Sequence, residues 1–484
     1  MRIAFINPPY LHIYGKIATG KHCSFPLGLG YMASYVREHG HTPAIFDIEA
    51  MPYPFAETWQ QILRFKPDLL AITSVTANFT QAKFLAEKAK TEIGCLVIMG
   101  GPHVAALPEA TLQAVTGLDA VITGEGEEPL RILADQFDAT GKVDFASVPS
   151  TCFIAHGKFQ RSARLSLIEN LDCIPYPARD LVDMSWYSLP PHFQRGKKSA
   201  TILSSRGCPS KCTFCGNLIH GRNFRFNSPD YFVSELQMLR DKYGIRHFHV
   251  VDDCFSADPE RVQAICRLIL DRKLTDITWF IFGRADTLQD EKLITSMRRA
   301  GCVYILLGVE SGSEHVLEKM RKETSLDTVR TCCKLLRKHR IAYFNSFMIG
   351  NVGETEEDVM KSIAFAKELK SVMAGFSIMT PFPGTHIFNK FYSDLANKDT
   401  HWDNFTSVAS KIAFTVKHTS LNNSDIERLT ALAYKKFYCD LSQILRLLSF
   451  INSPRTFIRY IGGGLGVLRY YLQLKRQSKS ANPG

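Results

Sequence analysis

The sequence lacks any uncharged apolar run of the roughly 20 residues that a membrane-spanning helix needs. It also lacks the apolar region and cleavage site of a secretory signal peptide, since a short apolar stretch at 3–6 is followed directly by Pro8 and Pro9. Cysteine is scarce, and 13 thiols in 484 residues are too few for a disulfide framework. A composition of 45% hydrophobic and 22% charged residues excludes a disordered or fibrous chain. We therefore expect a folded, cytoplasmic protein.

The chain carries an excess of positive charge. Its 58 Lys and Arg residues against 47 Asp and Glu give a net charge of +11. Such a balance favours anionic cofactors, nucleic acid or anionic membrane surfaces as partners. No helix-turn-helix or basic zipper pattern is present, so we expect no nucleic-acid partner.

Short apolar strands alternate with helices over the first 140 residues. This alternation predicts a parallel sheet covered on both faces, which is a doubly wound, Rossmann-like α/β domain at 1–140. The expected strands are 2–7, 43–46, 69–74, 95–99 and 120–122, and the expected helices are 27–39, 56–65, 81–91 and 129–137.

Small and hydroxyl residues follow three of these strands. Ligands of doubly wound sheets bind beyond the carboxyl ends of the strands, so these residues are candidates for a binding crevice. The alternative is that the glycines only form tight turns. The first turn has no Gly-x-Gly-x-x-Gly motif, which disfavours a dinucleotide. The candidates are Thr73, Ser74, Gly100, Gly101, His103, Gly124, Glu125 and Gly126.

A second series of strands and helices begins after a linker at 141–197, in which we expect a small strand pair. Six units of this kind are too few for a closed eight-stranded barrel, so we expect an open, partial (β/α)6 barrel at 198–390 with its site at the carboxyl ends of the strands. The remaining 391–484 is expected to be a basic, helical region. The expected barrel strands are 200–204, 247–251, 278–282, 303–307, 343–349 and 375–379.

Three cysteines stand together directly after the first barrel strand. Cys208, Cys212 and Cys215 have the spacing Cys-x3-Cys-x2-Cys. Three thiolates can hold three irons of a cubane cluster and leave the fourth iron open, as catalysis at a metal requires. A structural zinc site is the alternative, but it needs a fourth ligand, and the nearest candidate is His220.

At these residues the sequence resembles the radical S-adenosylmethionine (SAM) superfamily, whose motif has an aromatic residue before the last cysteine, here Phe214. The first 140 residues resemble the cobalamin-binding domain that precedes this core in one branch. The resemblance covers about 1–390 and is strongest to the class of the anaerobic Mg-protoporphyrin ester cyclase and many C-methyltransferases.

The resemblance implies cofactors and the residues that bind them. Cys208, Cys212 and Cys215 would hold a [4Fe-4S] cluster, SAM would bind the open iron, and cobalamin would bind the residues proposed above at 73–126. For Arg284 and Glu310 the alternative is a salt bridge within the barrel. The residues implied for the SAM pocket are Phe214, Arg284, Glu310, Ser311 and Gly350.

One departure concerns the lower ligand of cobalt. The Asp-x-His-x-x-Gly motif that supplies a histidine to cobalt is absent, and His103 stands in Gly-Pro-His-Val instead. We therefore expect cobalamin, if it is bound, to have no histidine lower ligand.

The resemblance implies an oxygen-sensitive enzyme that acts under anaerobic conditions. An electron passed through the cluster would cleave SAM to a 5′-deoxyadenosyl radical, which abstracts hydrogen from an unactivated carbon of a hydrophobic or secondary-metabolite substrate, and methylcobalamin would then supply a methyl group. One alternative is oxidative cyclisation or rearrangement without methyl transfer. A corrinoid-responsive sensor is a further alternative, but a sensor needs no open iron.

The expected partners are a small-molecule substrate and a reductant such as flavodoxin or ferredoxin. Arginine, lysine and aromatic residues alternate with apolar residues at 444–475, which is typical of a helix pair lying on the inner membrane surface. The alternative is a helical domain packed on the barrel. Membrane contact would favour a lipid or pigment as substrate.

Overall fold

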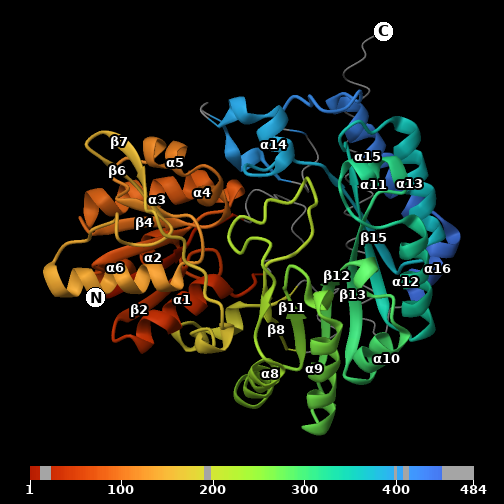
Figure 1. Ribbon diagram of the computed structural model, residues 1–484, viewed down its shortest axis with the longest axis horizontal. Helices are drawn as coiled ribbons and strands as arrows, with labels where there is room; N and C mark the ends of the chain where they lie inside the picture. The colour runs from red at the N-terminus through yellow and green to blue at the C-terminus, as the bar shows by residue number, and fades with distance from the viewer. Residues whose placement is uncertain (11–22, 190–197, 397–399, 407–411, 413, 450–484) are drawn as a thin grey trace.

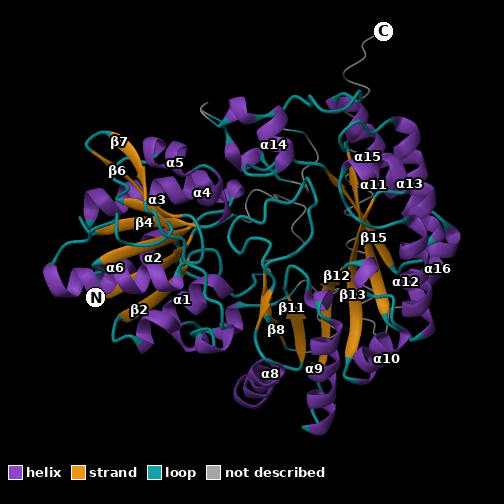
Figure 2. Ribbon diagram, in the orientation of Figure 1, coloured by secondary structure: helices purple, strands orange, loops and turns teal. Residues whose placement is uncertain are grey.

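Two β-sheets organise the chain in the computed structural model, one mostly parallel on the left and one wholly parallel on the right of Figures 1 and 2. The structure describes residues 1–10, 23–189, 198–396, 400–406, 412 and 414–449. The expected α/β class, with a doubly wound sheet followed by an open barrel and a helical region, is confirmed.

The N-terminal sheet has seven strands in the order β2-β1-β3-β4-β5-β6-β7. The first five are parallel, and β6 and β7 are antiparallel additions at the edge. The strand pair expected in the linker therefore extends this sheet. The strands are β1 Arg2–Asn7, β2 Thr42–Asp47, β3 Leu69–Thr73, β4 Leu96–Gly100, β5 Ala120–Ile122, β6 Thr151–Ala155 and β7 Lys158–Arg161.

Six α-helices in the described part of the chain accompany this sheet. The strand order reverses direction between β1 and β3, and this switch point opens a crevice at the carboxyl ends of the strands. The two short helices between β4 and β5 were not predicted, because neither is long enough to show an apolar period. The helices are α1 Leu27–Glu38, α2 Phe55–Phe65, α3 Phe79–Glu92, α4 Pro102–Ala106, α5 Pro108–Ala114 and α6 Glu127–Thr140.

The second sheet has six parallel strands in the order β15-β14-β13-β12-β11-β8. It stays open, as six strands do not close a barrel. Along β14 buried and half-buried residues alternate, because successive side chains face opposite sides of a strand. The strands are β8 Ser199–Ile202, β11 His247–Val250, β12 Thr278–Gly283, β13 Cys302–Glu310, β14 Ala342–Ile349 and β15 Met373–Ile378.

Helices cover the outer face of this sheet and continue beyond it (Figure 1). They are α8 Pro229–Tyr243, α9 Pro259–Asp271, α10 Glu291–Arg299, α11 Glu314–Lys319, α12 Leu326–Lys338, α13 Glu356–Glu368, α14 His386–Phe391, α15 Asn423–Tyr438 and α16 Leu441–Ser449. A short antiparallel pair, β9 Ser205–Arg206 with β10 Arg225–Phe226, closes the base of the cysteine loop.

Side chains from outside the barrel satisfy both edges of its sheet. On β15 the hydroxyl of Tyr438 accepts from the Ala374 amide (3.2 Å) and donates to the Ala374 carbonyl (2.8 Å). On β8 the fully buried Arg179 of the linker donates to the carbonyl of Thr201 (2.8 Å). Unpaired strand edges are thereby covered.

The chain returns to the N-terminal sheet after the barrel. Phe388, Trp402 and Phe405 lie in the same apolar cluster as Phe79 and Met99. This packing joins the two halves of the protein. Within the described ranges, no helix combines the length and hydropathy of a membrane span. A helix pair on the membrane surface is expected at 444–475, and residues 450–475 of this segment lie outside the described residues.

Candidate active site

The three motif cysteines lie in the loop between β9 and β10, directly after β8 at the carboxyl edge of the barrel sheet. Cys212 is buried, Cys208 is half-buried and Cys215 is exposed, and all three are free thiols. The loop thus presents three thiols where parallel barrels bind their ligands.

The surroundings of the Cys208 thiol favour its thiolate form. A hydrogen bond with the Cys254 thiol lowers the pKa of Cys208 to about 5, against the opposing effect of partial burial. The Arg284 guanidinium donates to the sulfur of Cys212 at 3.6 Å. Burial raises the pKa of Cys215. Because thiolates are the iron ligands of iron–sulfur clusters, this set of donors fits such a cluster. Cys254 follows β11 and carries no motif, so the sequence did not indicate it.

Arg284 and Glu310, both expected in the SAM pocket, are linked through Lys322, and Arg284 contacts Cys212. Arg284 also donates to the carbonyl of Lys322 (2.7 Å) and pairs with Asp286 (3.1 Å). The ammonium of Lys322 lies 3.2 Å from the carboxylate of Glu310 and 5.9 Å from the ring centre of Phe214. The salt bridges that are the alternative for both residues are therefore present, Arg284 with Asp286 and Glu310 with Lys322.

Glu310 has a backbone conformation that is rare for a residue with a side chain. Its φ is +72°, and it stands at a register shift between β13 and β14. Strain of this kind persists where the surrounding structure fixes it, and it clusters at binding sites. Gly308 provides the space, because a Cβ there would lie 3.0 Å from the Lys322 ammonium and against the Glu310 carboxylate. The strained turn holds one carboxylate at the carboxyl end of β13.

Ser311 and Gly350, the other residues expected in the SAM pocket, have partners within the fold. The buried Ser311 hydroxyl lies 3.2 Å from the Ser362 hydroxyl of α13. The Gly350 amide donates to Glu354 (2.6 Å), and its carbonyl lies 2.7 Å from Nε2 of His418. These contacts fix the strand ends around the site.

A cavity of about 390 Å³ lies at the switch point of the N-terminal sheet. The ends of β1, β2 and β3 and the start of α1 form its walls, which is where doubly wound sheets of this order bind ligands. Thr73 is the one member of the predicted cobalamin set that lines it. Gly28 also lines it, and a Cβ at Gly28 meets no atom within 4 Å. The walls include Asn7, Ser24, Gly28, Asp47, Glu49, Thr73 and Asn78.

Two other members of that set have conformations or partners fixed by the fold. Gly101 has a φ of +101°, and a Cβ there would meet the Ser74 carbonyl at 2.6 Å, so this turn requires glycine. His103 is buried between the rings of Phe79 (4.3 Å) and Trp402 (5.2 Å). Burial lowers the pKa of His103 to about 3, so the imidazole is neutral.

The loop at 124–127 joins the two halves of the protein through buried charges. Glu125 accepts from Arg225 (2.6 Å) and lies 3.0 Å from His220 and 3.3 Å from Arg206. Arg206 also pairs with Glu127 (2.5 Å). Burial alone would raise the pKa of Glu125, but the hydrogen bonds and the charge of these partners hold it well below its ordinary range.

We call these five residues the Glu125 cluster. It attaches the N-terminal sheet to the base of the cysteine loop, since Arg206 stands two residues before Cys208. His220, the candidate fourth zinc ligand, is engaged here. Gly100 ends β4, Gly124 follows β5 and Gly126 precedes α6.

Comparison with known proteins agrees with this geometry. Residues 202–366 match the radical SAM superfamily, and residues 15–134 match the B12 binding domain. An uncharacterized methyltransferase of Pyrococcus horikoshii is 32% identical over 446 residues, which cover 90% of this chain and 92% of that protein. The anaerobic magnesium-protoporphyrin IX monomethyl ester cyclase of Rubrivivax gelatinosus is 27% identical and is matched over 85% of this chain and 74% of its own.

A solved structure shares the fold over nearly the whole chain. It is the cobalamin-dependent S-adenosylmethionine radical enzyme OxsB with aqua-cobalamin and S-adenosylmethionine bound, which matches with a TM-score of 0.74 at 15% identity and covers 98% of this chain and 72% of that chain. The chain belongs to the radical SAM superfamily, in the branch that carries a B12-binding domain ahead of the radical SAM core.

Proposed function

We propose that the protein is a cobalamin-dependent radical SAM methyltransferase that methylates an unactivated carbon of a small-molecule substrate. The observation that carries the proposal is the cysteine loop at the barrel edge, with Arg284, Lys322 and Glu310 beside it and a B12-binding sheet attached at its base. We assign the cobalamin unit to 1–140, the linker to 141–197, the barrel to 198–390 and the helical region to 391–484.

Cys208, Cys212 and Cys215 hold the [4Fe-4S] cluster. When bound, the cluster supplies the electron for SAM cleavage, and cobalamin supplies the methyl group. Arg284 compensates the negative charge of the Cys212 thiolate. Lys322 and Glu310 offer the SAM amino and carboxylate groups a pair of opposite charges at fixed positions. Phe214, next to Cys215, contributes an apolar face.

Cobalamin is assigned to the carboxyl edge of the N-terminal sheet, over the cavity at the switch point and the strand ends at 73–74, 100–103 and 124–126. The neutral, enclosed state of His103 supports cobalamin without a histidine lower ligand. The backbone of the 124–126 turn and not the Glu125 side chain would face the cofactor, because the Glu125 side chain is committed to Arg225 and His220.

Oxidative cyclisation is the second candidate, favoured by the likeness to the cyclase of Rubrivivax gelatinosus. The two reactions differ in what they release. Methylation consumes SAM in two ways and yields both S-adenosylhomocysteine and 5′-deoxyadenosine, whereas cyclisation yields only the latter.

The test is anaerobic reconstitution with iron, sulfide and cobalamin, followed by incubation with extract of a deletion strain and mass spectrometry. We expect a product heavier by one methyl group, with S-adenosylhomocysteine and 5′-deoxyadenosine formed in equal amounts. A product without an added methyl group, formed together with 5′-deoxyadenosine but no S-adenosylhomocysteine, would refute methylation and support the cyclase reaction.

We further propose contact with the membrane surface through the C-terminal region and a lipid or pigment as substrate. Support comes from α16, where Leu441, Ile444, Leu445 and Leu448 are 71%, 40%, 59% and 46% exposed and lie on one helix face. Such a face can enter the headgroup layer of a bilayer. Flotation with anionic liposomes tests this: the full chain should float, protein truncated after Gln443 should not, and equal flotation would refute the contact.

A further inference from the structure

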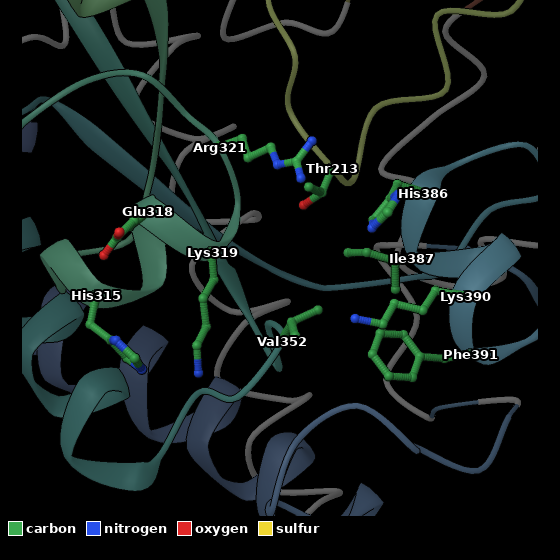
Figure 3. A pocket seen from close by; sticks show the side chains of 10 residues that line it. All are labelled: Thr213, His315, Glu318, Lys319, Arg321, Val352, His386, Ile387, Lys390 and Phe391. Atoms are coloured by element: carbon green, nitrogen blue, oxygen red, sulfur yellow. The ribbon is translucent and has the colours of Figure 1, made fainter.

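A cavity of about 490 Å³ lies beside the cysteine loop, outside the group formed by Arg284, Lys322 and Glu310. Four segments surround it: the cysteine loop at Thr213, the α11 helix with the residues that follow it, the loop after β14 at Val352, and α14 (Figure 3). Its walls are Thr213, His315, Glu318, Lys319, Arg321, Val352, His386, Ile387, Lys390 and Phe391.

Positive charge dominates these walls. Lys319, Arg321 and Lys390 are exposed, and none of the three forms an ion pair with any carboxylate in the described ranges. Glu318 is the one carboxylate of the lining. Figure 3 shows the Arg321 guanidinium beside Thr213 and the Lys390 ammonium directed into the cavity. Unpaired cations gathered in a hollow raise the local concentration of an acidic partner.

The cavity wall is continuous with the cysteine loop. The Thr213 amide donates to the carbonyl of Met320 (2.9 Å), which follows α11, and the Ile387 amide of α14 donates to the carbonyl of Thr213 (3.4 Å). Thr213 is bonded directly to Cys212, so their Cα atoms are about 3.8 Å apart. A partner seated here is therefore separated from a cluster ligand by a single layer of protein.

We infer that this cavity is the docking site of an acidic one-electron carrier of the flavodoxin or ferredoxin kind, which reduces the cluster through the Thr213 side of the loop. The inference rests on the proposed function, since it requires the cluster. One electron leaves the reduced carrier, passes through the cluster and enters the sulfonium of SAM. The S–C5′ bond breaks to methionine and the 5′-deoxyadenosyl radical, and the carrier is left oxidised by one electron.

A transient redox encounter suits this surface. Such complexes bury less than about 1,200 Å², and their association depends on charge and therefore on salt. The exposed Lys211, within the cysteine motif, adds to the positive charge of the loop. Thr213, Val352 and Ile387 give the charged rim a partly apolar floor.

The test uses the reconstituted holoenzyme, a flavodoxin as probe and one charge-reversal variant carrying Lys319→Glu, Arg321→Glu and Lys390→Glu. The matched control carries Lys66→Glu, Lys142→Glu and Lys158→Glu, three exposed lysines of the first 160 residues that do not line the cavity. Flavodoxin binding is measured by calorimetry, and cluster reduction is followed by stopped-flow absorbance.

We expect the charge-reversal variant to bind flavodoxin about tenfold more weakly than the wild type, and its cluster to be reduced about tenfold more slowly. The control variant should behave as the wild type does. The difference should shrink as ionic strength rises from about 0.02 to about 0.3 M. SAM cleavage driven by dithionite, which needs no docking, should be equal in all three proteins.

Equal flavodoxin binding and equal reduction rates in wild type and charge-reversal variant would overturn the docking site. Inorganic phosphate that binds the wild type but not the variant, while flavodoxin reduces both alike, would do the same and identify a small-anion site. If the wild type did not cleave SAM even with dithionite as reductant, the proposed function would be refuted, and the docking site with it.

Discussion

Removing the charge of Glu125 should weaken the attachment between the two halves of the protein. In the Glu125 cluster two carboxylates face two guanidinium groups, and all four side chains are at most 5% exposed. Glu125→Gln keeps the shape and one acceptor but leaves an uncompensated positive charge. Breaking a buried ion pair costs about 3–5 kcal/mol, and we expect the lower end because the amide oxygen still accepts from Arg225.

The expected result is a large loss of thermal stability. One kcal/mol corresponds to about 2–4 °C for a unit of 150–250 residues, so the loss is roughly 6–12 °C. The assay is thermal unfolding of the anaerobic holoenzyme at neutral pH. The matched control is Glu128→Gln, whose carboxylate pairs with Arg131 near the surface (2.7 Å) and contributes less than about 1 kcal/mol. A Glu125→Gln shift no larger than the Glu128→Gln shift would refute the reasoning.

The stability contributed by Glu125 should also depend on pH. Its folded-state pKa lies below the ordinary carboxyl value of about 4.3, so the contribution is fully present above that value and is lost as pH falls below it. The difference in unfolding temperature between wild type and Glu125→Gln should therefore be constant from about pH 6 to 8 and should narrow below about pH 4. A difference that grows toward acid pH would contradict the assignment of the charge.

Two further predictions concern the binding sites. Gly308→Ala should lower SAM affinity about tenfold, because its Cβ would displace the Glu310 carboxylate and the Lys322 ammonium from the positions at which they meet SAM. Equilibrium dialysis of the reconstituted enzyme measures this affinity, and an unchanged affinity would show that the pair does not belong to the SAM site. Gly28→Trp should fill the switch-point cavity and reduce the cobalamin content of the protein, while its iron content stays normal. The control Gly28→Ala, whose methyl group meets open space, should bind as much cobalamin as the wild type. Equal cobalamin content in both variants would show that cobalamin does not bind in this cavity.

Features fixed by local sequence were predictable. The strand expected at 2–7 is β1, and the one expected at 343–349 begins one residue earlier in β14, because an apolar run between turn residues identifies a buried strand without knowledge of its neighbours. The cysteine loop was also predictable from local sequence, since its three cysteines lie within eight residues.

Features made by distant residues were not predictable. Glu125 meets Arg225 across 100 residues, and nothing near Glu125 distinguishes an ion-pair partner from a cofactor ligand. Lys322 lies in the site because the chain after α11 brings it next to Glu310. Cys254 lies there because β11, which it follows, pairs with β8. The antiparallel pair β6 and β7 was expected, but its place at the edge of the N-terminal sheet depends on pairing with β5.

The most direct test of the central claim is SAM cleavage by the reconstituted protein and by a variant in which Cys208, Cys212 and Cys215 are all replaced by Ala. Reduced with dithionite under anaerobic conditions, the wild type should show the spectrum of a [4Fe-4S] cluster and release 5′-deoxyadenosine from SAM. The variant should bind no cluster and release none, while keeping its cobalamin, since the switch-point cavity is formed by other residues. Release of 5′-deoxyadenosine by the triple variant would contradict the account.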